Sequence, residues 1–259
     1  MSLTFVNSFG TIKHILEVIK NKKSGVYMRY GDGDFNIARG LDDMMASANS
    51  RFSLKMRESF KLTNDEIIIG IPHHCKILNT VESGMFPGNH EYDGRCVIEY
   101  IKNFGESRKV FYTNIALHWC SNKYPDVVVE LHKEIKTNKV LFIGNEDIKS
   151  ELLNTLFGED ISRINVPYRD AFNRFDGVMN EFKEFIDKQS SNEYFIIIMA
   201  SGCAGRVFSS EIYSNKFNSN KNFFILDYGS LLDYFSGNIS RAFMKLDPPN
   251  SEYILNRIT

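Results

Sequence analysis

Short apolar runs that alternate with helix-length segments are the feature that most constrains the fold of this 259-residue chain. Runs of strand length occur at residues 26–30, 67–71, 110–112, 140–143, 161–166, 195–200 and 223–226. A segment of helix length, residues 9–19, precedes the first run, and further segments of helix length lie between most of the runs, at residues 127–136, 148–157, 172–186 and 207–217. Strands that alternate with helices form βαβ units. The pattern predicts an α/β fold with a doubly wound, mostly parallel Rossmann-like sheet that carries helices on both faces.

The composition is that of an ordinary globular protein, with 43% hydrophobic and 24% charged residues. No internal repeat or linker divides the chain, so we expect a single domain over residues 1–259. The formal net charge is −1, which argues against nucleic acid as a partner. We expect a cytoplasmic protein without a transmembrane segment, because the longest strongly apolar run, residues 195–200, cannot span a bilayer. The oligomeric state is not predicted.

The segment after the first predicted strand, residues 29–35, reads RYGDGDF. Ligands of parallel sheets bind at the carboxyl ends of strands, so this segment is a candidate site. In an extended stretch the carboxylates of Asp32 and Asp34 would point to the same side and repel each other, unless a cation lay between them or one stayed protonated. Carboxylate oxygens suit Mg²⁺ or Mn²⁺, and Gly31 and Gly33 would let a ligand approach the backbone. The alternative is a solvated turn, because Asp-Gly pairs often form turns.

The stretch YMRYGDGDFNIARG, residues 27–40, resembles the signature of GT-D-type glycosyltransferases. That motif runs Arg, aromatic, Gly, Asp, Gly, Glu, and here Asp34 stands in the place of the Glu. Four later segments, residues 67–72, 141–145, 200–204 and 226–230, are similar to the segments that follow strands in that family. Residues 113–120 do not match the family clearly.

The resemblance implies a metal-dependent glycosyltransferase with a GT-D-like domain. Such an enzyme would move a hexose from a nucleoside-diphosphate sugar, with UDP as the expected nucleotide, to a glycan or glycoprotein acceptor. It implies further that Asp32 and Asp34 bind the Mn²⁺ or Mg²⁺ ion that accompanies the donor.

Several residues after other strands are candidates for donor binding. Arg29 either pairs with Asp32 or Asp34 or clamps a donor phosphate. Asn145 is either a nucleotide contact or a cap for the helix expected to begin near Asp147.

The segment 201–206, SGCAGR, lies between the most hydrophobic strand and a predicted helix. The small residues Ser201, Gly202 and Gly205 would let the helix N-terminus present N–H groups to a diphosphate. A plain tight turn is the alternative interpretation.

The acceptor hydroxyl needs a general base if the reaction inverts the anomeric centre. Asp227 is the first candidate, because it follows a strand and should emerge at the same sheet edge as Asp32. It is also a candidate for donor binding, or for a plain turn or cap aspartate. His74 and Glu82 are further candidate bases in the glycine- and proline-containing segment 72–95, where a polar loop without catalytic residues is the alternative.

Two other functions remain open from the sequence. Paired aspartates after strands also serve metal-dependent phosphohydrolases that act on nucleotides or sugar phosphates. A catalytically silent nucleotide-sugar-binding protein is the other possibility, because Asp34 is one methylene shorter than the Glu of the family motif.

Overall fold

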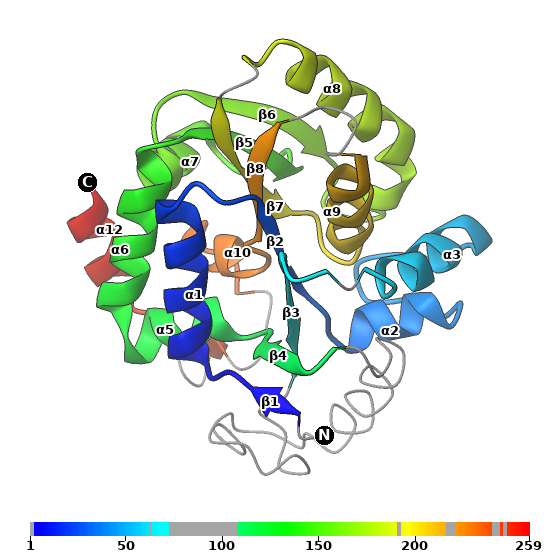
Figure 1. Ribbon diagram of the computed structural model, residues 1–259, viewed down its shortest axis with the longest axis horizontal. Helices are drawn as coiled ribbons and strands as arrows, with labels where there is room; N and C mark the ends of the chain where they lie inside the picture. Colours follow the sequence, from blue (N-terminus) through cyan, green and yellow to red (C-terminus); the bar gives the residue numbers. More distant parts are fainter. Residues whose placement is uncertain are drawn as a thin grey trace.

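The structure is a computed structural model of the protein that describes residues 3–62, 64–72, 108–190, 193–215, 221–239, 244–245 and 248–259. In these residues eight strands form one sheet through the middle of the molecule, in the order β1-β4-β3-β2-β8-β7-β5-β6 (Figure 1). All neighbouring strands are parallel. The strands are β1 (Thr4–Phe5), β2 (Gly25–Arg29), β3 (Ile67–Ile71), β4 (Val110–Thr113), β5 (Lys139–Asn145), β6 (Ile161–Val166), β7 (Tyr194–Ala200) and β8 (Asn222–Asp227).

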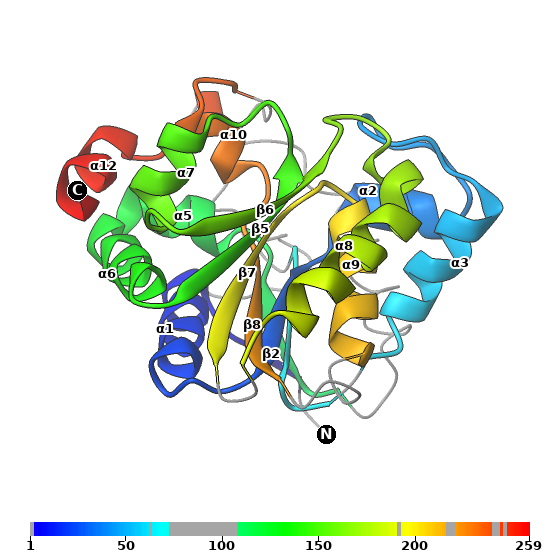
Figure 2. The same cartoon turned by 90° about the horizontal axis from the view of Figure 1, so that it is seen from above.

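Helices cover both faces of the sheet, as Figure 2 shows. One face packs against α2 (Asp32–Ala38), α3 (Ser50–Ser59), α8 (Phe175–Asp187) and α9 (Ala204–Asn215). The other packs against α1 (Ser8–Lys20), α5 (Ala116–Lys123), α6 (Pro125–Lys136), α7 (Ser150–Phe157), α10 (Leu231–Phe235) and α12 (Ser251–Ile258). The predicted doubly wound α/β fold is therefore confirmed. No helix in the described part of the chain is long and apolar enough to cross a membrane.

Every predicted apolar run lies in a strand whose bounds differ from the prediction by one or two residues at most. Strand β1 was not predicted, because two residues are too short to show a pattern. The predicted helix over 172–186 begins instead at Phe175, since Ala171–Arg174 forms a 3₁₀ turn. Segment 113–120, which matched no family pattern, supplies most of α5.

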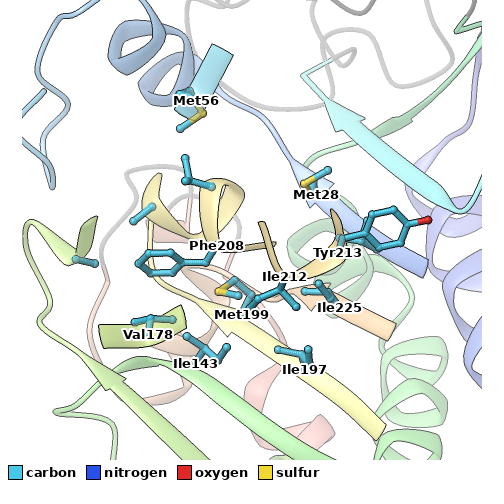
Figure 3. Close-up of a cluster of buried hydrophobic side chains, with 14 of the residues drawn as sticks. Met28, Met56, Ile143, Val178, Ile197, Met199, Phe208, Ile212, Tyr213 and Ile225 are labelled. Atoms are coloured by element: carbon cyan, nitrogen blue, oxygen red, sulfur yellow. The ribbon is translucent and has the colours of Figure 1, made fainter. Parts of the chain in front are cut away.

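Strand β7 is the centre of the hydrophobic core because both of its faces are covered. Ile197 and Met199 face α8 and α9, whereas Ile196 and Ile198 face the opposite helix layer. Figure 3 shows Ile197 and Met199 beside side chains of α9, among them Phe208. Each such side chain contributes about 1.5–3 kcal/mol when it is fully buried. The strand ends are thereby held on a rigid layer.

The sheet has a topological switch point between β2 and β8. These two strands are hydrogen-bonded neighbours, but the chain leaves them in opposite directions. After β2 it enters α2, whose Phe35 belongs to one core, and after β8 it enters α10, whose Leu231 belongs to the other. Diverging connections open a crevice at the carboxyl ends of the two strands, where doubly wound proteins bind ligands.

His132 of α6 forms a hydrogen bond with Tyr228, the residue that follows β8. Its Nδ1 lies 2.9 Å from the carbonyl oxygen of Leu156 and its Nε2 lies 3.0 Å from the hydroxyl of Tyr228. Because a carbonyl can only accept, Nδ1 carries the proton and Nε2 accepts from the Tyr228 hydroxyl. Burial lowers the pKa of His132 to about 4, so the ring is neutral.

The buried His132 predicts a loss of stability in acid. The unfolded chain takes up a proton near the ordinary pKa of 6.5, whereas the folded chain resists protonation down to about pH 4. The free energy of unfolding should therefore fall as the pH falls between these values, by up to about 3 kcal/mol. Urea unfolding of the wild type and of His132→Gln, followed by circular dichroism from pH 7 to pH 4, measures this contribution as the difference between the two proteins. A difference independent of pH would contradict the prediction.

Candidate active site

Four charged side chains from four elements meet at the carboxyl ends of β2 and β8. We call them the ion cluster: Arg29 of β2, Asp34 of α2, Arg206 of α9 and Asp227 at the end of β8. Their side chains are between 3% and 13% exposed. Buried charges persist only where opposite charges and hydrogen bonds compensate for the lost water, so the cluster must act as one unit.

Arg29 and Asp227 form the centre of the ion cluster. Arg29 Nη2 donates to Asp227 Oδ1 over 3.1 Å, and the Arg29 backbone N–H donates to Asp227 Oδ2 over 3.2 Å. We expected a structural Arg29 to pair with Asp32 or Asp34, and this was wrong. The parallel pairing of β2 with β8 brings Asp227 to the guanidinium, although the two residues are 198 positions apart in sequence.

Gly229 makes room for the guanidinium of Arg29. A Cβ at this position would lie 1.6 Å from Arg29 Nη2, and the backbone has φ +56°, in the left-handed region. Both conditions exclude a side chain. The turn after β8 therefore has to be a glycine for the ion pair to form.

Arg206 connects the ion cluster to the loop after β7. Its Nε donates to the carbonyl oxygen of Arg29 and lies 3.3 Å from Asp34 Oδ1 and 3.4 Å from Asp227 Oδ2. Its Nη1 donates to the carbonyl oxygen of Gly202. Burial by itself lowers the pKa of Arg206, but the carboxylates of Asp227 and Asp34 outweigh it and raise the pKa overall. Arg206 is thus permanently charged.

Asp32 and Asp34 lie in the first turn of α2, and not in an extended stretch as we expected. Gly31 is the N-cap, and its N–H donates to Asp34 Oδ2 over 2.8 Å. Two residues along a helix correspond to roughly 200° of rotation, so the two side chains diverge. Asp34 is buried, whereas Asp32 is exposed and accepts from the N–H of Gly33. Helix formation is favourable here because carboxylates in a first turn interact well with the helix dipole.

The buried Asp34 has an unusual acidity. Burial raises its pKa from 3.8 to about 6, although the charge of Arg206 and the hydrogen bond from Gly31 oppose the rise. Asp34 therefore changes its protonation state just below neutral pH, and the net charge of the ion cluster changes with it.

The carboxylates of Asp32 and Asp34 do not face a common point in the described arrangement. Their carboxylates face different surroundings, and Asp34 Oδ2 already accepts from Gly31. Within the described residues no group of three His, Cys, Asp or Glu side chains is placed to hold a metal ion. Of these two residues, Asp32 is the one with an exposed carboxylate.

The loop after β7 approaches the sheet closely. Ser201 Oγ donates to the carbonyl oxygen of Ile143, which ties the loop to β5, and Gly202 has φ +56°. At Gly205 a Cβ would lie 3.0 Å from Met199 Cγ, so the first turn of α9 packs tightly on β7. The helix therefore starts at the same sheet edge as the ion cluster.

The other predicted residues occupy different surroundings. Gly33 is a packing glycine, since a Cβ there would lie 2.4 Å from Asp43 Oδ1. Asn145 ends β5 two strands away from β8, and its Oδ1 accepts from the N–H of Asp147, which is a turn rather than a helix cap. His74 and Glu82 lie outside the described residues.

Sequence reasoning missed Arg206 and Asn114. Arg206 is the last residue of the segment 201–206, and a charged residue so soon after a strongly apolar run was a usable signal. Asn114 follows β4, and its Nδ2 donates to the carbonyl oxygen of Tyr30 over 2.8 Å. Arg29 Nη1 donates to the carbonyl oxygen of Asn114 over 3.3 Å. Nothing local in sequence connects Asn114 to β2, because only the sheet order places them together.

Comparison with known proteins finds a matching family and solved structures of similar fold. The family model described as glycosyltransferase GT-D fold matches residues 27–231. A structure described as a new glycosyltransferase (DUF1792) from Streptococcus sanguinis has a TM-score of 0.65 at 15% identity, over 96% of this chain and 93% of that chain. A structure described as the highly conserved domain of unknown function 1792, with a distinct glycosyltransferase fold, has a TM-score of 0.63 at 15% identity, over 96% and 90%. No curated protein matches the chain.

Gly229→Ala should destabilise the protein far more than Gly202→Ala. Both glycines have φ +56°, but a Cβ at Gly202 meets no atom within 4 Å, whereas one at Gly229 displaces Arg29 from Asp227. We expect about 1 kcal/mol for Gly202→Ala from backbone strain, and about 3 kcal/mol or more for Gly229→Ala. Chemical denaturation of both variants measures the difference. Equal losses would mean that the ion pair adjusts without cost.

The raised pKa of Asp34 predicts a second pH dependence of stability. The protonated form suits the buried site, so the stabilisation relative to Asp34→Asn is complete below pH 4 and is lost as the pH rises through about 6. The free energies of unfolding of the wild type and of Asp34→Asn, measured from pH 4 to pH 7.5, give this contribution as their difference. A difference that rises with pH would show that Asp34 is instead stabilised as the carboxylate.

Proposed function

The chain belongs to the family of glycosyltransferases with the GT-D fold, and from this we propose that it transfers a hexose from a nucleoside-diphosphate sugar, with UDP as the expected nucleotide. The proposed acceptor is a glycan or a glycoprotein. The family match over residues 27–231 supports glycosyl transfer. The choice of donor and acceptor class rests on the resemblance of the RYGDGD segment to the family motif.

The observation that carries the proposal is the position of Arg206 beside the strand-to-helix turn at the switch point. Arg206 lies in the first turn of α9 and is bonded to Gly202 of the preceding loop. A helix start favours anions through its N–H groups and dipole, and a guanidinium adds a full positive charge. This combination suits a diphosphate at the carboxyl ends of β7 and β8.

Charge development explains why such a site would promote sugar transfer. The acceptor oxygen forms a bond to the anomeric carbon, the bond from that carbon to the diphosphate oxygen breaks, and the acceptor hydroxyl loses its proton. Negative charge accumulates on the departing diphosphate. Positive groups already held in place there stabilise the transition state more than the ground state. We assign this role to Arg206 and the loop with Ser201, Gly202 and Gly205, with Arg29 supporting it from β2.

We propose that Asp227 positions the two arginines. Both of its oxygens contact guanidinium or backbone donors of Arg29, and Oδ2 also faces Arg206. Its role as the base that receives the acceptor proton stays a prediction, as do the same roles for His74 and Glu82. Asn145 stays a predicted nucleotide contact.

The proposed dependence on Mn²⁺ or Mg²⁺ rests on the family resemblance. Asp34 already contacts Gly31 and Arg206, so Asp32 is the residue of the pair whose substitution should change the effect of the metal on donor binding. Mg²⁺ commonly binds through one or two carboxylates together with substrate phosphate oxygens. A test of the donor site should therefore include Asp32.

We expect a nucleotide sugar to raise the melting temperature of the wild-type protein, most strongly with Mn²⁺ present. At about 100 times its dissociation constant the ligand adds roughly 2.7 kcal/mol, or several degrees in a chain of this size. Thermal shifts with UDP-, GDP- and ADP-hexoses identify the nucleotide. Asp32→Asn should lose the part of the shift that requires metal, because it loses a carboxylate without touching the core.

Asp187→Asn is the matched control, since Asp187 is also exposed but ends α8. It should keep the full shift. Mass spectrometry of reactions with glycan acceptors then tests transfer itself. Release of free hexose that needs no acceptor, or no shift with any nucleotide sugar in a folded protein, would contradict the proposed function.

A further inference from the structure

Asn114 lies beside the ion cluster but comes after a different strand. It follows β4, and hydrogen bonds connect it to the last residues of β2 in two ways. Its Nδ2 donates to Tyr30 O, and its own carbonyl accepts from Arg29 Nη1. Asn114 therefore has a fixed position at the carboxyl edge of the sheet, on the side of β2 away from β8.

The orientation of the Asn114 amide is determined by its neighbour. A backbone carbonyl can only accept, so the group facing Tyr30 O must be the NH₂ and not the oxygen. Asn114 Oδ1 is consequently the atom that points away from Tyr30. Turning the amide over would place two acceptors against each other and would lose the 2.8 Å hydrogen bond.

Asn114 Oδ1 is buried and has no hydrogen-bond partner, and the same is true of Arg29 Nε. Arg29 as a whole is only 6% exposed. A buried polar atom without a partner costs about 1–3 kcal/mol, and such atoms are rare in folded proteins. Here an orphan acceptor and an orphan donor occur in two residues that are bonded to each other. This points to a ligand group that is missing from both.

The amide of Asn114 lies beside the N-cap of α2. A Cβ added to Gly31 would lie 3.9 Å from Asn114 Nδ2 and 4.0 Å from Asp34 Oδ2, which is ordinary van der Waals distance. The described residues thus leave room for a group about the size of a methyl beside Asn114 Nδ2, and a ligand would reach the covered Oδ1 by a small shift of the amide.

The chemistry of the two orphan atoms selects the ligand. A phosphate oxygen would accept from Arg29 Nε, but it would repel the lone pairs of Asn114 Oδ1. A sugar hydroxyl can donate to Asn114 Oδ1 and also accept from a guanidinium. We propose that Asn114 binds a hydroxyl group of the transferred hexose and so contributes to the choice of donor sugar. This inference rests on the proposed function.

The test compares Asn114→Ala with the wild type by isothermal titration calorimetry, using UDP-glucose, UDP-galactose and UDP alone in the presence of Mn²⁺. We expect the variant to bind the UDP-hexose about tenfold more weakly, the usual effect of one lost hydrogen bond in a buried site, and to bind UDP as the wild type does. UDP lacks the sugar, so it separates a lost sugar contact from a distorted site. Asn154→Ala, an exposed asparagine of α7, is the matched control and should bind all ligands normally.

Deoxy forms of the bound UDP-hexose identify the hydroxyl. One deoxy form should bind the wild type about tenfold more weakly than the unmodified UDP-hexose does. The same deoxy form should bind Asn114→Ala with the affinity of the unmodified UDP-hexose for that variant, because the two changes remove the same contact. Equal weakening for UDP and UDP-hexose, or unchanged affinity for both, would overturn the inference while leaving the proposed function intact. A wild-type protein that binds neither UDP-hexose would overturn the proposed UDP donor, and this inference with it.

Discussion

The contact of Asp227 with Arg29 and Arg206 is the interaction on which the rest of the site depends. It joins the end of β2 to the end of β8 and the start of α9, which lie far from β2 in the sequence. An isolated arginine at this depth would be strongly unfavourable, and removing the Asp227 carboxylate would leave two buried cations with Asp34 as the remaining carboxyl group of the ion cluster. The hydrophobic layers hold β2 and β8 in register, and this register places the charged side chains of the ion cluster within contact distance of one another.

Two supports fix Asp227 in place. The glycine at position 229 lets the chain turn sharply while Arg29 passes close to it. On the opposite face, His132 accepts from the hydroxyl of Tyr228, the residue next to Asp227. Arg206 of α9 contacts Asp227 from the other helix layer, so the switch point between β2 and β8 is held from both layers.

The fold was largely predictable from the sequence, because buried parallel strands appear as continuous apolar runs and each was found close to its predicted bounds. The position of the ion cluster at the carboxyl ends of strands was partly predictable, since Arg29 and Asp227 stand at the ends of such runs. Side-chain partners were not. Arg29 pairs with Asp227 because β2 and β8 are neighbours, and strand order is a property of the whole fold. The helical start at Asp32 was missed because Asp-Gly repeats suggest a turn, while Gly31 as N-cap and two acidic residues in the first turn equally favour a helix.

The balance of charge in the ion cluster links acidity to the proposed donor site. Arg206 faces two carboxylates, and burial keeps the pKa of Asp34 at about 6 in spite of that positive neighbour. The two arginines and two carboxyl groups of the ion cluster balance when both carboxyl groups are ionised, and the cluster carries an excess positive charge when Asp34 is protonated. In that state Asp227 is the remaining carboxylate of the cluster beside Arg206. The charge that the cluster presents at the carboxyl ends of β2 and β8 therefore depends on Asp34.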